Sequence, residues 1–506
     1  MSQVVVDGPT GPIIGTASGG VADYPGVAYA HARRFAEAGE PHRAQGPATA
    51  FPQRPGMLDA LLGRALGEAE QSEDSFSLRI QAPVGASNAP VIVFIPGGAF
   101  VSGSAHARWF TSPHLVREGP VVLVTVNHRL GALGTLGFDA DGGTAPGLPD
   151  AAGSPLALSD LVQAIRWVHA TIGLFGGDPN NVIVAGDSAG AWLAYALARL
   201  PELAGLVSAA LLISLPRLDP LSPADDDARR AAFLDAFGPA ADLPQAPVSR
   251  ILDAQVAAGR AYRGRGFPFA PATGPRLPAW LAHYDRSAPQ LHVSRVLQIT
   301  TTEESAAFLH AAPRDGFDQD FLRRFADDHF ADPAAALAYA RARRPGASAY
   351  RLAVDLGTLH QFRLPALEIA QATRQAGIAT QVLRFGVQSR LDSVFSPHCM
   401  VLPFLFGGLP AWHDAPMLAG IDPAQFEDAR RALTGVVLDF ARGAVMKMGD
   451  DPHTPARRAT RLPSIMTGNA APYGTQGGMS MMELDEAGLR DGQPDEVEQH
   501  LVALPA

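Results

Sequence analysis

The sequence is poor in cysteine, in lysine and in long apolar runs, and each shortage excludes a class of protein. Its 506 residues include one cysteine, Cys399, so no disulfide can form within the chain and nothing marks an oxidising compartment. Lys447 is the only lysine, and the formal net charge of −10 would repel a nucleic-acid chain. No apolar run approaches the roughly 18 residues of a membrane-spanning helix, so we expect no membrane span.

The first residues also lack the features of an export signal. Met1 to Pro9 contain neither the basic region nor the apolar region of a signal peptide, which predicts a cytoplasmic protein. The rest of the composition is ordinary, with 47% hydrophobic and 18% charged residues. Because large α/β enzymes often form one unit, we expect a single domain over residues 1–506.

Short apolar runs alternate with helical patterns along the chain. Residues 91–95 and 121–126 are continuous, mostly β-branched runs, as in strands that are covered on both faces. Other strands are predicted at 76–81, 182–185, 209–213, 296–299 and 381–385, with a helix over 158–168. This alternation indicates an α/β fold with a central, mostly parallel sheet flanked by helices.

Two stretches depart from the alternation. About 216–290 is rich in Pro, Ala and Arg, and we predict an inserted region there that caps or lines a pocket. The tail from about 450 to 506 is rich in Gly and polar residues with weak periodicity, so we expect an irregular C-terminal segment.

Residues 186–190, Gly-Asp-Ser-Ala-Gly, carry the clearest chemical signal. They follow a predicted strand and precede the apolar helical run 191–198. A serine in G-x-S-x-G between a strand and a helix sits on a sharp turn that exposes its hydroxyl group. A glycine-rich turn whose serine only caps the helix is the alternative. We predict that Ser188 is a nucleophile.

A serine hydroxyl needs a histidine to take its proton and a carboxylate to orient that histidine. The chain order Ser, acid, His is typical of α/β-hydrolase sheets. Glu303 and Glu304 follow one late strand, and His398 lies in the loop after the next. Periodicity does not choose between the two glutamates, and Asp392 remains an alternative acid.

Backbone amides for an oxyanion must lie where no side chain interferes. The loop after strand 91–95, Pro96-Gly97-Gly98-Ala99, offers such amides, and the amide of Ala189 could converge with them. The alternative is a plain Pro-Gly turn between two elements.

Longer blocks support a family resemblance over about residues 20–445. They are Pro25–Ala30 with Arg34-Phe35, Ser72–Asp74 with Leu78, Val124–Gly131, and Trp167–Val182 with its F-G-G-D-P-N-N-V ending. Together they resemble the type-B carboxylesterase family, the cholinesterase-like branch of the α/β-hydrolases. The resemblance implies an α/β-hydrolase fold with helical insertions over the active site.

The same resemblance implies roles for the ambiguous residues. Glu304 precedes a G-x-x-F-like segment that ends at Phe308, which selects it over Glu303. His398 begins the segment that resembles the family's histidine motif. Ser214 matches a position that would hydrogen-bond the acid.

The oxyanion donors carry over to Gly98, Ala99 and Ala189. Two departures from the family pattern lie close to them. Pro96 stands where His or Tyr is usual, and Ala99 stands where a third glycine is usual. Cys399 follows the histidine where Gly is common, and we interpret it as a small buried residue.

The sequence therefore predicts a bacterial serine carboxylic-ester hydrolase that acts on a small-molecule ester without a metal or other cofactor. Phe100, Phe267 and Phe269 are candidate pocket residues, although core packing would explain them equally well. An acyltransferase, a cyclase or another non-hydrolytic enzyme of natural-product metabolism would use the same triad, and a non-catalytic cholinesterase-like binding protein is a further alternative. Monomer and homodimer both remain open.

Overall fold

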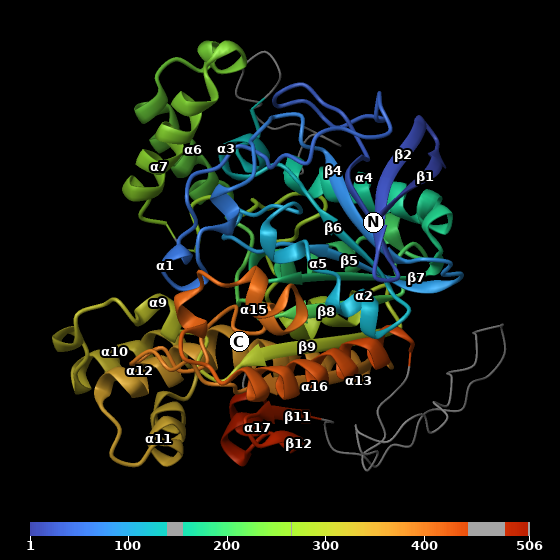
Figure 1. Ribbon diagram of the computed structural model, residues 1–506. Helices are drawn as coiled ribbons and strands as arrows, with labels where there is room; N and C mark the ends of the chain where they lie inside the picture. Colours follow the sequence, from blue (N-terminus) through green and yellow to red (C-terminus); the bar gives the residue numbers. More distant parts are fainter. Residues whose placement is uncertain (139–154, 265, 444–480, 504–506) are drawn as a thin grey trace.

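The computed structural model describes residues 1–138, 155–264, 266–443 and 481–503. Within them, one sheet has the strand order β1-β2-β3-β4-β6-β5-β7-β8-β9-β10-β11-β12 (Figure 1). The strands are β1 (Ser2–Gly8), β2 (Gly11–Ser18), β3 (Val21–Ala28), β4 (Ser77–Pro83), β5 (Ala89–Ile95), β6 (Val122–Val126), β7 (Gly177–Asp187), β8 (Ala209–Ile213), β9 (Arg295–Thr301), β10 (Ala379–Phe385), β11 (Met481–Asp485) and β12 (Gly488–Gly492). Neighbours from β6 to β11 pair in parallel, and the strands at both edges pair antiparallel.

This sheet confirms the predicted α/β architecture, and each predicted strand coincides with one of β4 to β10. The antiparallel strands β1 to β3 were not predicted. The longer helices are α4 (Leu156–Thr171), α5 (Ala189–Ala198), α6 (Pro223–Phe237), α7 (Val248–Ala261), α10 (Gln319–His329), α11 (Pro333–Arg343), α12 (Ala349–Thr358), α13 (Leu364–Gln375), α16 (Pro423–Ala441) and α17 (Glu496–Ala503). The shorter ones are α1 (Asp59–Leu62), α2 (His114–Glu118), α3 (Gly131–Thr135), α8 (Tyr284–Ser287), α9 (Ala306–Leu309), α14 (Leu402–Leu405) and α15 (Gly408–Ala411).

Several helices begin where the sequence offers a capping side chain. Ser222 accepts a hydrogen bond from the Asp225 amide at the start of α6. Asp318 and Asp422 do the same for the first turns of α10 and α16. Such a cap satisfies amides that have no partner within the helix, and its loss typically costs about 1 kcal/mol.

The sheet separates two apolar cores, because successive side chains of a strand point to opposite faces. On β5, Val91 and Val93 join a core formed with α4, α5 and α13, while Ile92 and Phe94 join a core formed with α2, α14 and α16. All four side chains are almost completely buried. This two-sided burial explains why the central strands are continuous apolar runs.

Two helical groups interrupt the alternation of strands and helices. Helices α6 and α7 lie between β8 and β9, within the segment 216–290 that the sequence predicts as an insertion, and α10 to α12 lie between β9 and β10. Figure 1 shows the two groups above and below α1 on the same side of the molecule. Arg34 donates to Glu73 and to the backbone carbonyls of Leu243 and Ala246, so it links the N-terminal part of the chain to the first group. The insertion and the single domain stay predictions.

The C-terminal segment corrects one expectation. Residues 481–503 are not irregular but form β11, β12 and α17, and the rest of the stretch from 450 lies outside the described residues. The parallel pairing of β11 with β10, and the buried Met481 and Met482, stabilise strands whose own periodicity is weak. In the part of the chain described, no helix is long and apolar enough to cross a membrane.

Candidate active site

The turn between β7 and α5 presents Ser188. The residue has φ 54° and ψ −124°, a conformation that is strained for any residue with a side chain. A Cβ atom on Gly186 would meet the Gly190 backbone at 2.3 Å, and one on Gly190 would meet the Ile95 carbonyl oxygen at 2.1 Å. Both glycines are therefore required by close packing, as the G-x-S-x-G pattern predicts. The Ser188 amide donates to the Ile213 oxygen at 2.9 Å and anchors the turn to the next strand.

His398 and Glu304 form a buried pair. Nδ1 of His398 lies 2.6 Å from Oε2 of Glu304, and both side chains are almost fully buried. The other Glu304 oxygen accepts the Ser214 hydroxyl and the Thr301 amide, each at 2.7 Å. These contacts leave the carboxylate one orientation, which holds the imidazole with Nε2 directed away from it.

The two rival acids lie elsewhere. Glu303 turns to the opposite side, where its carboxylate accepts hydrogen bonds from Arg344, Arg351 and Gln388. Burial alone would raise the pKa of Glu303, but the charge of Arg351 and these hydrogen bonds hold it below its ordinary value. Asp392 is exposed on the loop before His398. The structure thus brings Glu304, and neither rival, to the histidine.

The loop after β5 is built around its glycines. Gly98 has φ 133°, and a Cβ atom there would meet the Ser102 carbonyl oxygen at 2.2 Å. Ala99 has φ 52°, a left-handed conformation that is unfavourable for alanine. The Gly98 carbonyl accepts the Val101 and Ser102 amides, whereas the Gly98 and Ala99 amides donate to no acceptor among the described residues. These free amides are what an oxyanion site needs.

One cavity of about 690 Å³, counting its open mouth, joins these parts. Ser188, His398, Gly98 and Ala99 all line it. Nε2 of His398 is buried and has no hydrogen-bond partner in the described residues. The His398 ring lies beside Phe308 and Phe362, with ring centroids 5.2 and 5.0 Å away. A buried polar atom without a partner beside an open cavity is available to a ligand or a reacting group.

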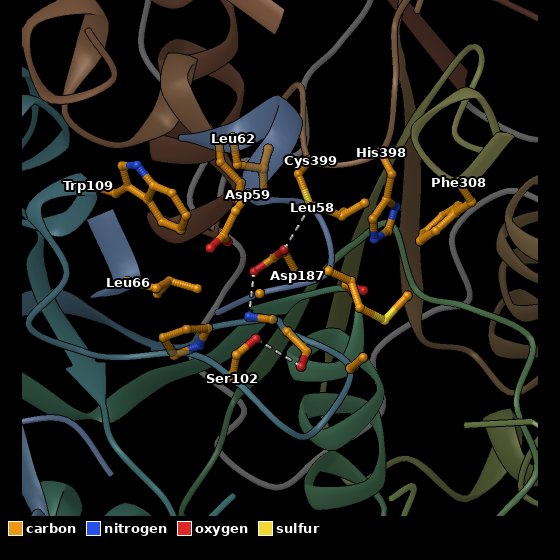
Figure 2. Close-up of a pocket in the computed structure, with 18 of the residues that line it drawn as sticks. Leu58, Asp59, Leu62, Leu66, Ser102, Trp109, Asp187, Phe308, His398 and Cys399 are labelled. Atoms are coloured by element: carbon orange, nitrogen blue, oxygen red, sulfur yellow. Dashed lines mark hydrogen bonds between the residues drawn. The ribbon is translucent and has the colours of Figure 1, made fainter. Parts of the chain in front are cut away.

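The wall of the cavity is mostly apolar (Figure 2). Its apolar side chains are Met57, Leu58, Leu62, Leu66, Trp109, Phe110, Phe267, Phe308 and Leu402. The carboxylates of Asp59 and Asp187 also face it, and burial raises the pKa of both. Trp109 stacks on Trp412 at a centroid distance of 4.4 Å, which fixes one side of the wall.

Only one of the three predicted pocket phenylalanines lies there. Phe267 lines the cavity. Phe100 instead packs edge-on against Trp192 in the core, with ring centroids 5.5 Å apart, and Phe269 packs in the cluster around α6 and α7. Sequence reasoning missed the α1 region, although Leu58, Leu62 and Leu66 recur at helical spacing and indicate an apolar helix face.

One group outside the cavity has side chains of metal-ligand type. Ligand atoms of His31, His42 and Asp74 lie within 4.8 Å of one another near the surface. Asp74 already pairs with His31 at 3.1 Å and with Arg43 at 2.8 Å, and none of these residues lines the cavity. The site around Ser188 itself contains the residue types of acid–base and nucleophilic chemistry.

The sheet, the serine turn and the paired histidine define an α/β-hydrolase. Comparisons with known proteins narrow this class: the family described as "Carboxylesterase family" matches residues 2–258. A probable N-octanoylanthranilate hydrolase of Rhodococcus erythropolis is 32% identical over 84% of this chain and 89% of its own length. Phenmedipham hydrolase of Pseudarthrobacter oxydans is 28% identical over 81% of this chain and 80% of its own.

Comparison with a solved structure supports the same family. The carboxylesterase of Geobacillus stearothermophilus, in its crystal structure at pH 6.2, is similar with a TM-score of 0.75 and 25% identity, and the match covers 98% of this chain and 99% of that one. The chain belongs to the carboxylesterase family, and it is a carboxylic ester hydrolase.

Proposed function

We propose that the protein hydrolyses esters through an acyl-enzyme formed on Ser188, with His398 as general base and Glu304 as the acid that orients it. Ser188 attacks the ester carbonyl carbon while Nε2 of His398 takes its proton. The protonated histidine then gives that proton to the leaving alcohol. Water repeats the sequence on the acyl-enzyme and releases the carboxylic acid.

The amides of Gly98, Ala99 and Ala189 would stabilise the oxyanion of both tetrahedral intermediates. The first two amides donate to no acceptor among the described residues, and Ala189 begins α5, where amides lack partners within the helix. Donors fixed in this way need no reorganisation as negative charge develops on the carbonyl oxygen.

One observation carries the proposal: Nδ1 of His398 is held by Glu304 at 2.6 Å, and its Nε2 is unpartnered at the cavity that Ser188 also lines. No hydrogen bond joins Ser188 to His398 in this structure among the described residues. Catalytic hydrogen bonds are often long before substrate binds and tighten in the substrate complex.

A fluorophosphonate probe tests this assignment. We expect the wild-type protein to be labelled once, at Ser188, and Ser188→Ala to lose labelling and about 10⁶-fold in kcat. Cys399→Ser is the control, because Cys399 is the only thiol and also lines the cavity. It should still be labelled at Ser188. Labelling of Cys399, or of another serine, would contradict the proposal.

The apolar wall supports a substrate with an apolar acyl group of medium length. The Rhodococcus relative is named for hydrolysis of a compound with an octanoyl group. We expect kcat/KM for p-nitrophenyl octanoate to exceed that for the acetate, since each buried methylene contributes about 0.8 kcal/mol. Leu62→Trp should reduce this preference, whereas Leu174→Trp, at an exposed surface leucine, should leave it unchanged. An acetate preference in the wild type would contradict this substrate class.

A further inference from the structure

Asp187, directly before the proposed nucleophile, is a buried carboxylate that the mechanism above does not use. It ends β7, and only 2% of the residue is exposed. Within the described residues, its carboxylate accepts hydrogen bonds from an amide and a thiol, and from no cation. Burying a carboxylate without a cationic partner costs free energy, so the hydrogen bonds of Asp187 must offset that cost.

Those hydrogen bonds reach two other loops (Figure 2). Oδ1 accepts the Gly97 amide at 2.8 Å, and Oδ2 accepts the Cys399 thiol at 3.6 Å. Gly97 directly precedes Gly98 in the candidate oxyanion loop, and Cys399 directly follows His398. One side chain therefore joins the three segments that carry the nucleophile, the oxyanion amides and the base.

Each contact depends on an unusual local feature. A Cβ atom on Gly97 would meet both the backbone oxygen and the carboxylate of Asp187 at 2.7 Å, so only glycine allows this close approach. Cys399 has φ 68°, a left-handed conformation that is rarely populated by residues other than glycine. Burial raises the pKa of the Cys399 thiol well above its ordinary value, with Asp187 and Glu304 adding to the effect. The thiol therefore stays protonated and can donate.

We propose that Asp187 is a positioning residue, whose carboxylate holds the oxyanion loop through Gly97 and the histidine turn through Cys399 in register with Ser188. This inference rests on the proposed function. Residues that act in this way affect the geometry of the transition state more than the binding of substrate. Their loss should therefore lower kcat and leave KM nearly unchanged.

The test compares four variants in steady-state hydrolysis of p-nitrophenyl butyrate. Asp187→Ala should lower kcat about 100-fold, the loss typical of catalytic groups displaced by about 1 Å. Asp187→Asn can still accept from Gly97 but not from Cys399, and it should lose about tenfold, as expected for one lost hydrogen bond of about 1.4 kcal/mol. Cys399→Ala should resemble Asp187→Asn. Cys399→Ser restores a donor and should recover most of the activity.

A trifluoromethyl ketone adds a readout that general destabilisation would not change. Its adduct with serine carries an oxyanion, so its affinity should fall in Asp187→Ala by the same factor as kcat/KM. Glu303→Gln is the control for loss of a buried carboxylate outside the cavity, because Glu303 contacts arginines on the α11–α12 side. It should lower the melting temperature without weakening this inhibitor.

The outcomes separate the two proposals. If the wild type is labelled at Ser188 but Asp187→Ala keeps wild-type kcat, the positioning role is wrong and the proposed function stands. If the wild type is not labelled at Ser188, the proposed function itself fails. Should Asp187→Ala not fold, the cysteine pair decides: equal kcat in Cys399→Ala and Cys399→Ser would overturn the inference.

Discussion

Glu303 and Glu304 are neighbours in sequence and both buried, yet they have opposite surroundings. Glu303 is 1% exposed and pairs with two arginines, Arg344 at 2.7 Å and Arg351. Glu304 is fully buried, and the only ionisable side chain that it hydrogen-bonds among the described residues is His398. The chain turns sharply after β9, which sends the two side chains to different sides.

The difference shows how a carboxylate held by arginines differs from the one that we propose orients the general base. The positive charges of Arg344 and Arg351 neutralise the Glu303 carboxylate. We therefore expect Glu303 to stabilise the fold and to take no part in the reaction. In the proposed mechanism Glu304 faces a histidine that becomes protonated during the reaction, and the negative charge of Glu304 stabilises that protonated form most. Burial alone does not distinguish the two glutamates; the partner side chains do, two arginines for Glu303 and one histidine for Glu304.

Among the changes that test this comparison of the two glutamates, Glu304→Gln should have the largest effect. The amide keeps the size of the side chain and its contacts to Ser214 and Thr301, but it removes the charge that stabilises the protonated histidine. We expect kcat to fall about 10⁴-fold with little change in melting temperature. Hydrolysis of p-nitrophenyl butyrate together with a thermal melt measures both quantities. A loss below tenfold would show that Glu304 is not the orienting acid.

Glu303→Gln should show the reverse pattern. The substitution leaves Arg344 and Arg351 without their shared anion, although Asp355 remains within 3.6 Å of Arg351. Removing one partner of a buried ion pair typically costs about 4 kcal/mol, so the free energy of unfolding in urea should fall by up to that amount. kcat below the melting temperature should stay within about threefold of the wild type. A large loss of kcat in a folded Glu303→Gln variant would show that Glu303 contributes to activity as well as to stability.

A third buried glutamate extends the comparison to pH. Burial would raise the pKa of Glu498 in α17, but Arg363 and Arg384 outweigh it and lower the pKa from 4.5 to about 2. Because the pKa is depressed in the folded state, its stabilisation is complete above about pH 4.5 and is lost as the pH falls towards 2.

The corresponding measurement is urea-induced unfolding of wild type and Glu498→Gln between pH 6 and pH 2. Between those limits the wild type should lose about 3 kcal/mol more than the variant, which has no carboxylate to protonate at this position. Other carboxylates titrate in both proteins and cancel in the difference. Parallel pH curves would show that α17 does not depend on this ion pair.

Features of the fold and the site that depend on residues close together in sequence could be predicted, and features that depend on residues far apart could not. The serine turn could be predicted because the G-x-S-x-G pattern and the strand and helix beside it are all local in sequence; Gly186 is required by a contact with Gly190, although Gly190 is required by a contact with Ile95 on a strand that is distant in sequence. Periodicity left Glu303 and Glu304 undecided, since the turn that separates them follows from tertiary packing; the family resemblance favoured Glu304. The hydrogen bond between Asp187 and Cys399 joins positions 212 residues apart, and neither residue alone indicates it.

The walls of the site were the least predictable part. Phe100 follows the candidate oxyanion loop and Phe267 lies in the predicted insertion, but of these two only Phe267 lines the cavity. Phe100 has φ 65°, and this backbone conformation accompanies a ring that packs into the core against Trp192. Strands β11 and β12 were missed for a related reason: their own sequence pattern is weak, and they are stabilised by the pairing of β11 with β10 and of β12 with β11.

The smallest loss of activity among the tests around Glu304 should come from Ser214, whose hydroxyl group donates a hydrogen bond to Glu304. Ser214 donates to Glu304 Oε1 at 2.7 Å, and its φ of 51° gives Ser and Ala a similar backbone strain. A hydrogen bond to a charged group contributes about 1.5–3 kcal/mol, and the Thr301 amide still serves the same oxygen. Ser214→Ala should therefore lose about 1.5 kcal/mol of transition-state stabilisation, or about tenfold in kcat/KM.

Ser396→Ala is its matched control on the other side of the turn. Ser396 is also fully buried, but its amide donates to Glu303 and its hydroxyl donates to the Phe385 carbonyl oxygen. Replacing that hydroxyl leaves every hydrogen bond of Glu304 in place, so kcat/KM should stay within about twofold while stability falls by about 1 kcal/mol. If both alanine variants lost activity equally, loose packing would explain the loss. A loss of kcat/KM in Ser214→Ala but not in Ser396→Ala would instead show that activity depends on the hydrogen bonds of Glu304 and not on this hydroxyl group beside Glu303.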